Sequence, residues 1–366
     1  MITGHAYPWD VLGDPDFPAR VSDHGISEVT LACAYHAVRA ATPLHPSHQV
    51  ITAPTSASYR PVRPEAWAGH RLVPVSWPDA PNPFDDATAV LTGAGLGVTA
   101  WLVLTHNSRL GTDCPDVAVV NCFGDRYPHA LCPRWPEVQR YAATLAVEAV
   151  RGADVSGVLL EAWGQQGIAH AGMHDKTTGA WSPTATRLLS ICCCTACQQA
   201  WPLDPAQAMA ELRDAVRSHR ESAVAEEIRA TKAAGAAQLL STVVDALGPD
   251  IPVTVFTDPD PWSATPVTAV DPRVTTAVVS AWSTDPARAT AVAAARAALP
   301  PDITVGAYVT VLPPVDPQTV PAHVQRLRAA GARQLNLYHL GLAGTDRQWA
   351  LGAAVTAGQA GRETAV

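Results

Sequence analysis

The sequence predicts a (β/α)8 TIM barrel, a closed ring of parallel strands surrounded by helices. Three observations predict it: the length of 366 residues, the 48% apolar content, and the alternation of short apolar runs with alanine-rich helical stretches. This length is normal for a barrel that carries long loops. A doubly wound open sheet is the alternative, although no G-x-G-x-x-G motif follows the first strand.

The predicted strands are apolar runs without strict alternation, as expected of strands that are covered on both faces. In chain order they are residues 2–7, 27–35, 97–105, 156–163, 252–257, 275–281, 303–310 and 334–339. Helices are predicted at residues 136–151, 204–248, 287–298 and 316–330. The last three begin at or directly after an Asp-Pro pair, in which aspartate caps the helix and proline suits its first turn.

The connections after the second, third and fourth strands are long, and they cover residues 36–95, 106–135 and 164–203. A loop that follows a strand lies at the carboxyl end of a barrel, where barrel enzymes build their active sites. The sequence shows no internal repeat and no linker. We therefore expect one domain over residues 1–356 and a flexible tail over residues 357–366.

Composition excludes several classes of protein. The net charge of −8 and the absence of a basic stripe argue against a nucleic-acid partner. The apolar runs are shorter than the ~20 residues of a membrane span, and the start MITGHAYPWD does not resemble a signal peptide. We expect a cytoplasmic protein with reduced thiols, a small-molecule substrate and no organic cofactor. Homo-oligomerisation stays open.

Cysteines supply the sharpest local motif. Cys192, Cys194 and Cys197 form a C-x-C-x-x-C turn beyond the fourth strand. Cys132, in the loop after the third strand, is the expected fourth ligand of a structural zinc ion, because neighbouring loops of a barrel can meet. Cys193 would take no part, and the alternative is an apolar cysteine cluster without metal. Other candidates for the fourth ligand are Cys114 and Cys122.

Glu161 is a carboxylate inside an otherwise apolar strand, VLLEAWG. Burial would raise its pKa towards neutrality, which suits a general acid. Asp258 follows the next strand, so the two carboxyl groups could flank a scissile bond, with Asp258 as base or nucleophile. Three alternatives stay open: an ion pair for Glu161, a turn role for Asp258, and a catalytic role for Asp10.

The other polar and aromatic residues near strand ends are expected to bind a sugar-like ligand. Aromatic rings pack on sugar faces, and polar side chains bond to sugar hydroxyl groups. The expected set is Trp9, Asp10, Tyr35, His36, His106, Asn107, Trp163, His174, Lys176, Trp262, Trp282, Tyr308 and His339. Each tryptophan could instead pack at the rim. The histidines 36, 106 and 339 could instead hold a catalytic metal.

The segment LSICCCTACQQAW, residues 189–201, resembles the zinc turn of the family 42 β-galactosidases, which are TIM-barrel glycoside hydrolases. In that family a cysteine from the loop after strand three completes the site, a place that Cys132 would take here. The segments THNSRLG, NCFGDRYPHALCPRWPEV and GMHDK resemble uncharacterised bacterial glycosyl-hydrolase-like proteins. The resemblance implies a structural zinc ion and a carbohydrate-like substrate.

The family pattern also has an Asn-Glu pair at the end of strand four and a nucleophilic Glu at the end of strand seven. Here Leu160 precedes Glu161, and strand seven, GAYVTVLPP, has no acidic residue. We expect a glycoside-hydrolase-like enzyme in which Glu161 works with Asp258 or Asp10. The alternatives are a barrel isomerase or lyase with a histidine base, and an inactive barrel that binds a sugar or a protein.

Overall fold

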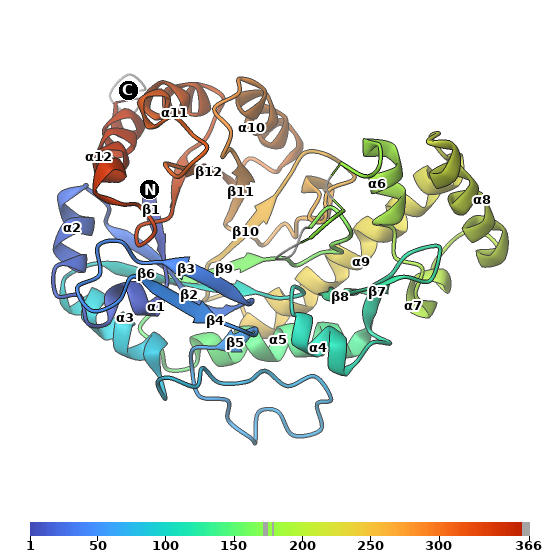
Figure 1. The fold of residues 1–366 in the computed structure, drawn as a ribbon, viewed down its shortest axis with the longest axis horizontal. Coiled ribbons are helices and arrows are strands. Elements are labelled where there is room, and N and C mark those ends of the chain that lie inside the picture. The colour runs from blue at the N-terminus through green and yellow to red at the C-terminus, as the bar shows by residue number, and fades with distance from the viewer. Residues whose placement is uncertain (171–174, 178, 361–366) are drawn as a thin grey trace.

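A computed structural model describes residues 1–170, 175–177 and 179–360 (Figure 1). Parallel strands within these residues form a closed barrel: each strand pairs with the next, and the last pairs with the first. The barrel strands are β1 (Ile2–Ala6), β2 (Glu28–Tyr35), β6 (Gly97–Val103), β9 (Gly157–Glu161), β10 (Val253–Thr257), β11 (Thr276–Ser280), β12 (Thr304–Thr310) and β13 (Gln334–Tyr338). The predicted TIM barrel is confirmed.

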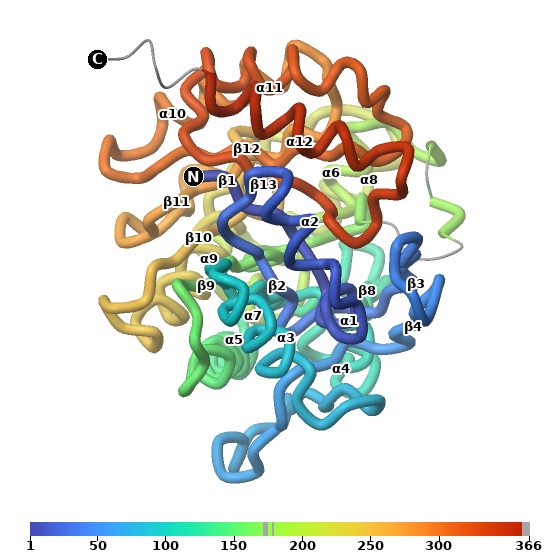
Figure 2. The backbone as a smooth tube through the Cα atoms, turned by 90° about the vertical axis from the view of Figure 1, so that its left-hand side faces the viewer, coloured from blue at the N-terminus to red at the C-terminus, as the bar shows by residue number. Residues whose placement is uncertain are grey.

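Helices surround the barrel in both views (Figures 1 and 2). They cover the outer faces of the strands, so the strands are buried on both sides, as their apolar runs predict. The helices around the barrel are α1 (Pro8–Val11), α2 (Phe17–Asp23), α3 (Pro83–Gly93), α5 (Pro136–Val150), α9 (Ala223–Leu247), α10 (Ala287–Ala298), α11 (Val320–Ala329) and α12 (Thr345–Gln359). None in the described part of the chain is long and apolar enough to cross a membrane.

The helix predicted over residues 204–248 is two helices, α8 (Pro205–Ser218) and α9. Helix α8 ends at His219, which adopts the left-handed region with a φ of 54°. Helix α9 restarts after Ser222, whose side chain accepts a hydrogen bond from the backbone N–H of Ala225. The break contains neither glycine nor proline, so the helical pattern of the sequence continues through it.

The three long loops carry elements of their own. The loop after β2 holds β3 (Val38–Ala41), β4 (Val50–Ala53) and β5 (Ala57–Ser58). The loop after β6 holds α4 (Ser108–Asp113), β7 (Ala118–Val120) and β8 (Arg126–Leu131). The loop after β9 holds α6 (Pro183–Leu189) and α7 (Thr195–Gln198). The pairs β3–β4 and β7–β8 are antiparallel hairpins. These elements stand at the carboxyl ends of the strands, where the candidate site lies.

Helix α12 continues to Gln359, beyond the predicted domain boundary at residue 356. The first residues of the predicted tail are therefore helical, and residues 361–366 lie outside the described part of the chain. A second apolar cluster lies apart from the barrel core, among α6, α8 and the start of α9. In Figure 1 this group of helices projects from one side of the barrel.

Candidate active site

Glu161 is the last residue of β9, and its side chain is partly buried. Its Oε2 accepts a hydrogen bond of 2.7 Å from the indole Nε1 of Trp101 on β6. Burial raises the pKa of Glu161 to about 7, although the Trp101 bond acts in the opposite direction. In the described part of the chain Glu161 has no ion-pair partner, so the alternative of a structural ion pair is not seen.

The turn after Glu161 is held in an unusual conformation. Ala162 has a φ of 52°, in the left-handed region that residues with a Cβ rarely adopt. The Thr105 hydroxyl donates to the carbonyl oxygens of Ala162 and Gly164, at 2.6 and 3.0 Å. A Cβ on Gly164 would lie 1.8 Å from the Ala264 carbonyl oxygen, so only glycine fits there. These contacts set the direction in which β9 leaves the barrel.

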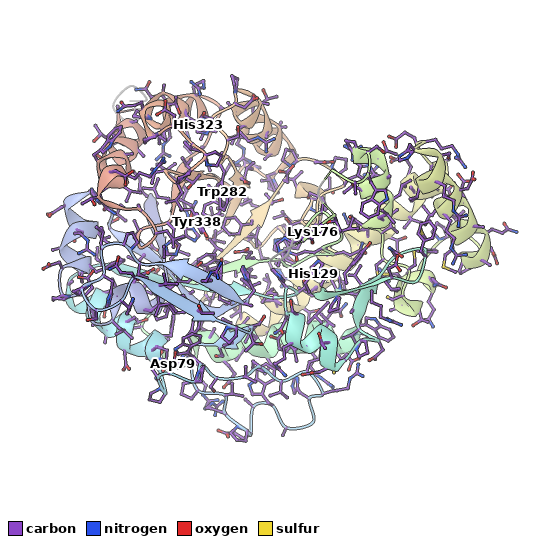
Figure 3. The ribbon with its side chains drawn as sticks, in the orientation of Figure 1. Asp79, His129, Lys176, Trp282, His323 and Tyr338 are labelled. Atoms are coloured by element: carbon purple, nitrogen blue, oxygen red, sulfur yellow. The ribbon has the colours of Figure 1, made fainter. Side chains whose placement is uncertain are left out.

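Aromatic rings surround Glu161. The rings of Tyr35 and Trp101 lie 4.6 Å apart, edge to face. Burial, and then the negative charge of Glu161, raise the pKa of Tyr35 and of Tyr308, so both phenols lie within the field of this carboxylate. Trp282 is 41% exposed and stacks on Tyr338 at 4.7 Å (Figure 3). Tyr338 is partly buried, so Trp282 supplies most of the exposed surface of this pair.

Asp10 is the second buried carboxylate at this end of the barrel. Its Oδ2 accepts a hydrogen bond of 2.8 Å from the Tyr7 backbone N–H and lies 3.7 Å from His339 Nδ1. Burial raises the pKa of Asp10 to about 7 and lowers that of His339 well below its usual value, so His339 is neutral and supplies no counter-charge. A Cβ on Gly341 would lie 2.1 Å from Asp10 Cγ, so this glycine makes room for the carboxyl group.

Asp258 directly follows β10 and is partly buried. Its Oδ1 accepts a hydrogen bond of 2.8 Å from the Asp260 backbone N–H, and its own N–H donates to the Thr265 carbonyl oxygen. These are the contacts of a turn residue, the alternative that its D-P-D-P sequence suggests.

Three of the four tryptophans expected at the mouth pack inside the protein instead. Trp163 is fully buried, and its Nε1 donates to the Phe256 carbonyl oxygen at 2.7 Å. Trp9 is buried, with its ring 4.6 Å from that of Tyr7. Trp262 packs partly buried against the second apolar cluster. Large apolar rings gain most from burial, so Trp9 and Trp163 lie in the core and Trp262 packs on the second cluster, and Trp282 is the exposed one of the four.

The remaining predicted contact residues differ in their placement. Asn107 is buried as the N-cap of α4: its Oδ1 accepts from the Leu110 N–H at 3.0 Å, and its Nδ2 donates to the Tyr141 hydroxyl at 3.4 Å. Both ends of this amide are therefore used within the protein. Lys176 is exposed on the loop after β9. His174 lies outside the described residues.

Histidines from separate loops gather near Tyr35. The rings of His36 and His106 lie 4.5 Å apart, and two histidines absent from the predicted site, His129 and His170, lie 5.9 and 4.3 Å from His106. Burial and the neighbouring imidazoles lower the pKa of His106 to about 2. His339 is not part of this cluster, because it packs on Tyr7.

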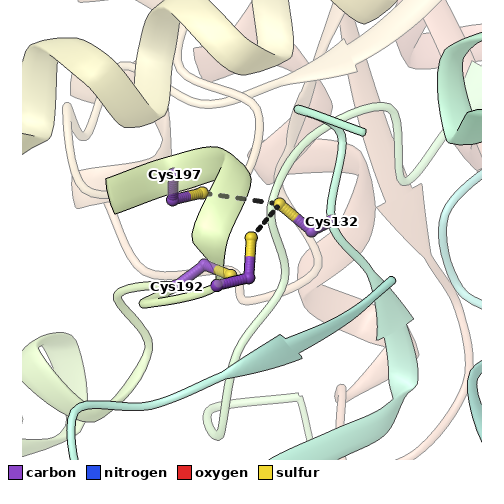
Figure 4. A group of neighbouring side chains, drawn as sticks. Cys132, Cys192 and Cys197 are labelled. Carbon is purple, nitrogen blue, oxygen red and sulfur yellow. Dashed lines mark hydrogen bonds between the residues drawn. The ribbon is translucent and has the colours of Figure 1, made fainter. Parts of the chain in front are cut away.

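The predicted cysteine group is assembled. The Sγ atoms of Cys132, Cys192, Cys194 and Cys197 are buried and lie within 4.8 Å of one another (Figure 4). The distances from Cys132 Sγ to those of Cys197 and Cys194 are 3.5 and 3.7 Å. Zinc–sulfur bonds of about 2.3 Å in a tetrahedron put the sulfurs about 3.8 Å apart, so the four thiols fit a metal ion. Cys193 lies outside this group, as expected.

Several residues of the candidate site were not predicted from the sequence. His5, Tyr7, Trp101 and Tyr338 line the barrel interior around Glu161 and Asp10. A signal for the first two was available, because His5 is a titratable residue inside the first strand and Tyr7 directly follows that strand. Nothing in the sequence marks His129, which lies on the β8 hairpin.

No protein-family model matches the sequence, and no curated protein matches it. Among solved structures, the chain is similar to alpha-L-fucosidase isoenzyme 2 from Paenibacillus thiaminolyticus, with a TM-score of 0.59 and 13% identity over 100% of this chain and 50% of that one. It is similar to the catalytic domain of beta-amylase from Paenibacillus polymyxa, with a TM-score of 0.60 and 9% identity over 98% of both chains. It is also similar to beta-galactosidase from the psychrophilic Marinomonas ef1, with a TM-score of 0.57 and 10% identity over 97% of this chain and 58% of that one.

These structures are TIM-barrel glycoside hydrolases, and this chain shares their fold. It spans about half the length of the fucosidase and somewhat more of the beta-galactosidase. Identities of 9–13% establish a fold and no particular activity. The fold shared with these structures is therefore a TIM barrel, and in this chain it carries a buried group of cysteines suited to a metal ion.

Proposed function

We propose that this chain is an enzyme that acts on a glycoside or a sugar-derived small molecule, with Glu161 as its general acid. One observation carries the proposal: Glu161 ends a barrel strand among aromatic rings, accepts one hydrogen bond from Trp101, and has a pKa of about 7. Such a carboxyl group still holds a proton near neutral pH and can give it to a leaving oxygen. The fold shared with glycosidases supports this proposal.

Asp10 and Asp258 are the candidates for the base or nucleophile. We favour Asp10, because it is a second buried carboxyl group at this end of the barrel; burial raises the pKa of Tyr338, and the charges of Glu161 and Asp10 both add to this effect. With a pKa of about 7, Asp10 is partly ionised at neutral pH and can accept a proton. Asp258 stays the alternative, held in its turn by the Asp260 N–H.

The sugar ring would stack on Trp282 and Tyr338, whose rings are nearly parallel at 26°. His36, His106 and Lys176 would bond to its hydroxyl groups from the other side of the mouth. A histidine base has less support, because His106 with a pKa of about 2 is a weak base and His339 is fully buried.

The test is a screen of aryl glycosides, followed by variants of the two carboxylates. Glu161→Gln should lower kcat by about 10²–10⁴-fold on a glycoside with a poor leaving group. The loss should be much smaller on a dinitrophenyl glycoside, whose leaving group needs no proton. Asp10→Asn should abolish turnover of both substrates, and Asp258→Asn should leave most of it.

Glu227→Gln is the matched control, because this glutamate is exposed on α9 and should not affect turnover. Equal losses on good and poor leaving groups in Glu161→Gln would refute the acid role. Binding of sugars without turnover of any glycoside would support the inactive-barrel alternative. We also propose that the cysteine group holds zinc in a structural role, because a closed set of four thiolates leaves no position for substrate.

A further inference from the structure

The amino ends of the barrel strands surround a cavity at the end of the barrel opposite to the candidate active site. This cavity has a volume of about 260 Å³. The interior of a TIM barrel is usually filled by layers of bulky, branched apolar side chains. At this end threonines from the strands take such positions and line the cavity: Thr3, Thr30, Thr99, Thr254, Thr276 and Thr304. The layer of the barrel at its amino end is therefore rich in hydroxyl groups.

Three of these threonines form a row across neighbouring strands. Thr254 on β10 is paired with Thr276 on β11, which is paired with Thr304 on β12. Residues paired in this way point to the same face of the sheet, and neighbouring strands lie about 4.8 Å apart. In the described part of the chain the hydroxyl groups of these three residues form no hydrogen bond. The row thus presents three hydroxyl groups that can bond to a molecule in the cavity.

Glu28 begins β2, which lies across the barrel from β11. Its Oε1 accepts a hydrogen bond of 2.9 Å from Ser156 Oγ and another from the Thr99 hydroxyl. The hydroxyl groups of Thr3 and Thr30 bond to each other at 2.8 Å. These bonds fix the carboxylate, and among the described residues its Oε2 has no donor. The wall that faces the threonine row therefore offers one oriented acceptor.

The cavity is open to solvent and has the size of a small molecule. Ser156 and Thr275 in its lining are exposed, and Glu28 is partly exposed. A water molecule takes up about 30 Å³ of liquid, so the cavity has room for on the order of ten non-hydrogen atoms. A monosaccharide or a cyclic polyol is of this size.

The lining combines polar and apolar groups. Its apolar part consists of Val158, Leu159, Pro252 and the methyl groups of the threonines. An ordered water needs 2–4 polar partners, which this part of the wall does not supply. A polyol has C–H groups for the apolar wall and O–H groups for the threonines and for Glu28. Since Glu28 is the one charged side chain in the described lining, the chemistry favours a ligand without negative charge.

We propose that this cavity binds a small neutral polyol, of the class of monosaccharides and cyclic polyols. The hydroxyl groups of Thr254, Thr276 and Thr304 bond to it from one wall, and Glu28 Oε2 accepts from it on the other. The site lies at the opposite end of the barrel from Glu161 and does not depend on the proposed hydrolysis. A ligand that binds here only in the folded state also stabilises the barrel.

The experiment is an NMR titration of full-length protein whose threonine methyl groups are isotope-labelled. The probe is myo-inositol, a cyclic polyol that has no glycosidic bond to hydrolyse. We expect the methyl resonances of Thr254, Thr276 and Thr304 to shift together with one Kd. Cyclohexanol has the same ring with a single hydroxyl group and should bind more weakly.

Thr254→Val and Thr276→Val keep the shape of the side chain and remove one hydroxyl group each. Each should weaken the binding of myo-inositol by about 2–10-fold, the effect of one hydrogen bond. Thr290→Val is the matched control, because this threonine is exposed on α10 and away from the cavity. Its Kd should equal that of the wild-type protein.

Methyl resonances that do not move would show that the cavity holds only water, and would overturn the proposal. Unchanged binding in both valine variants would also overturn it, as would equal binding of cyclohexanol. Thermal unfolding identifies a variant that fails to fold. In that event nuclear Overhauser effects between myo-inositol and the threonine methyl groups of the wild-type protein decide. A failed screen of glycosides leaves this result unaffected, and a failed titration leaves the proposed hydrolysis intact.

Discussion

At the scale of single residues, the proposed chemistry depends on two buried carboxyl groups. Glu161 and Asp10 are withdrawn from water, and in the described part of the chain neither faces a lysine or an arginine at ion-pair distance. Burial therefore raises the pKa of each to about 7. Both groups exchange protons near neutral pH, which exposed carboxylates do not.

Glu161→Gln should reduce the pH dependence of stability. The pKa of Glu161 rises from its ordinary 4.5 to about 7 on folding. Between these values the folded state keeps a proton that the unfolded state has lost, so the wild-type protein loses stability as pH rises through this window. The loss is on the order of 2–3 kcal/mol. Urea unfolding at about pH 5 and about pH 8 measures the decrease in the free energy of unfolding between these pH values. This decrease should be smaller in Glu161→Gln than in the wild-type protein, by on the order of 2–3 kcal/mol.

Histidines and other acids titrate in the same range, but they do so in both proteins, so the difference between them isolates Glu161. Glu227→Gln should behave like the wild-type protein, because this side chain is exposed. The same loss of stability in Glu161→Gln and in the wild-type protein would show that the pKa of Glu161 is not raised on folding.

At the scale of elements, the pairing of β6 with β9 positions Glu161, the proposed acid. The chain after β6 continues along β9, where the Leu104 N–H donates to the Glu161 carbonyl oxygen at 3.0 Å. Thr105 then bonds twice to the turn that contains Ala162, through its N–H and through its hydroxyl. A left-handed residue persists only where its surroundings hold it, and here Thr105 does so.

Thr105→Val should destabilise the fold and lower kcat together. Valine has nearly the same shape, but it leaves the Ala162 and Gly164 carbonyl groups without a hydroxyl donor. The expected cost is about 1–3 kcal/mol in the free energy of unfolding. Thr112→Val is the control, because the Thr112 hydroxyl donates to the Ser108 oxygen at an exposed position on α4. Similar small effects of both variants would contradict the role of Thr105.

At the scale of the whole molecule, the cysteine group joins two loops that the barrel brings together. Cys132 comes from the loop after β6, and Cys192, Cys194 and Cys197 come from the loop after β9. The loop after β9 also carries α6 and leads into α8, whose apolar faces form the second cluster beside the barrel. A metal ion at the cysteines would fasten this outlying part to the barrel.

Purified protein should contain about one zinc ion per chain, and Cys194→Ser should remove it. Losing the ion leaves buried thiols without a partner, so Tm should fall by several degrees or more. Metal analysis and thermal unfolding measure the two effects. Cys193→Ser is the control: it lies next to Cys194 in the chain but outside the group, and it should keep the ion. Zinc retained in Cys194→Ser would contradict the assignment.

The sequence by itself determined the barrel, its strands, the three long loops, the cysteine group and the buried glutamate. Each of these depends on a local pattern: apolar runs of strand length, helix caps such as Asp204-Pro205, close cysteine spacing, and a charge inside an apolar run. The break between α8 and α9 left no such pattern, because His219 takes its left-handed conformation without a glycine or proline to mark it.

Only the tertiary structure decided which side chains face the mouth. Trp163 and Trp9 are buried, whereas Tyr338 and Trp282 stack there and Trp101 bonds to Glu161. Burial depends on the neighbours that packing supplies from distant parts of the chain. The residues next to a tryptophan in the sequence do not indicate which neighbours these are. The histidine cluster has the same origin: its four members come from four segments, and closure of the barrel is what brings their loops together.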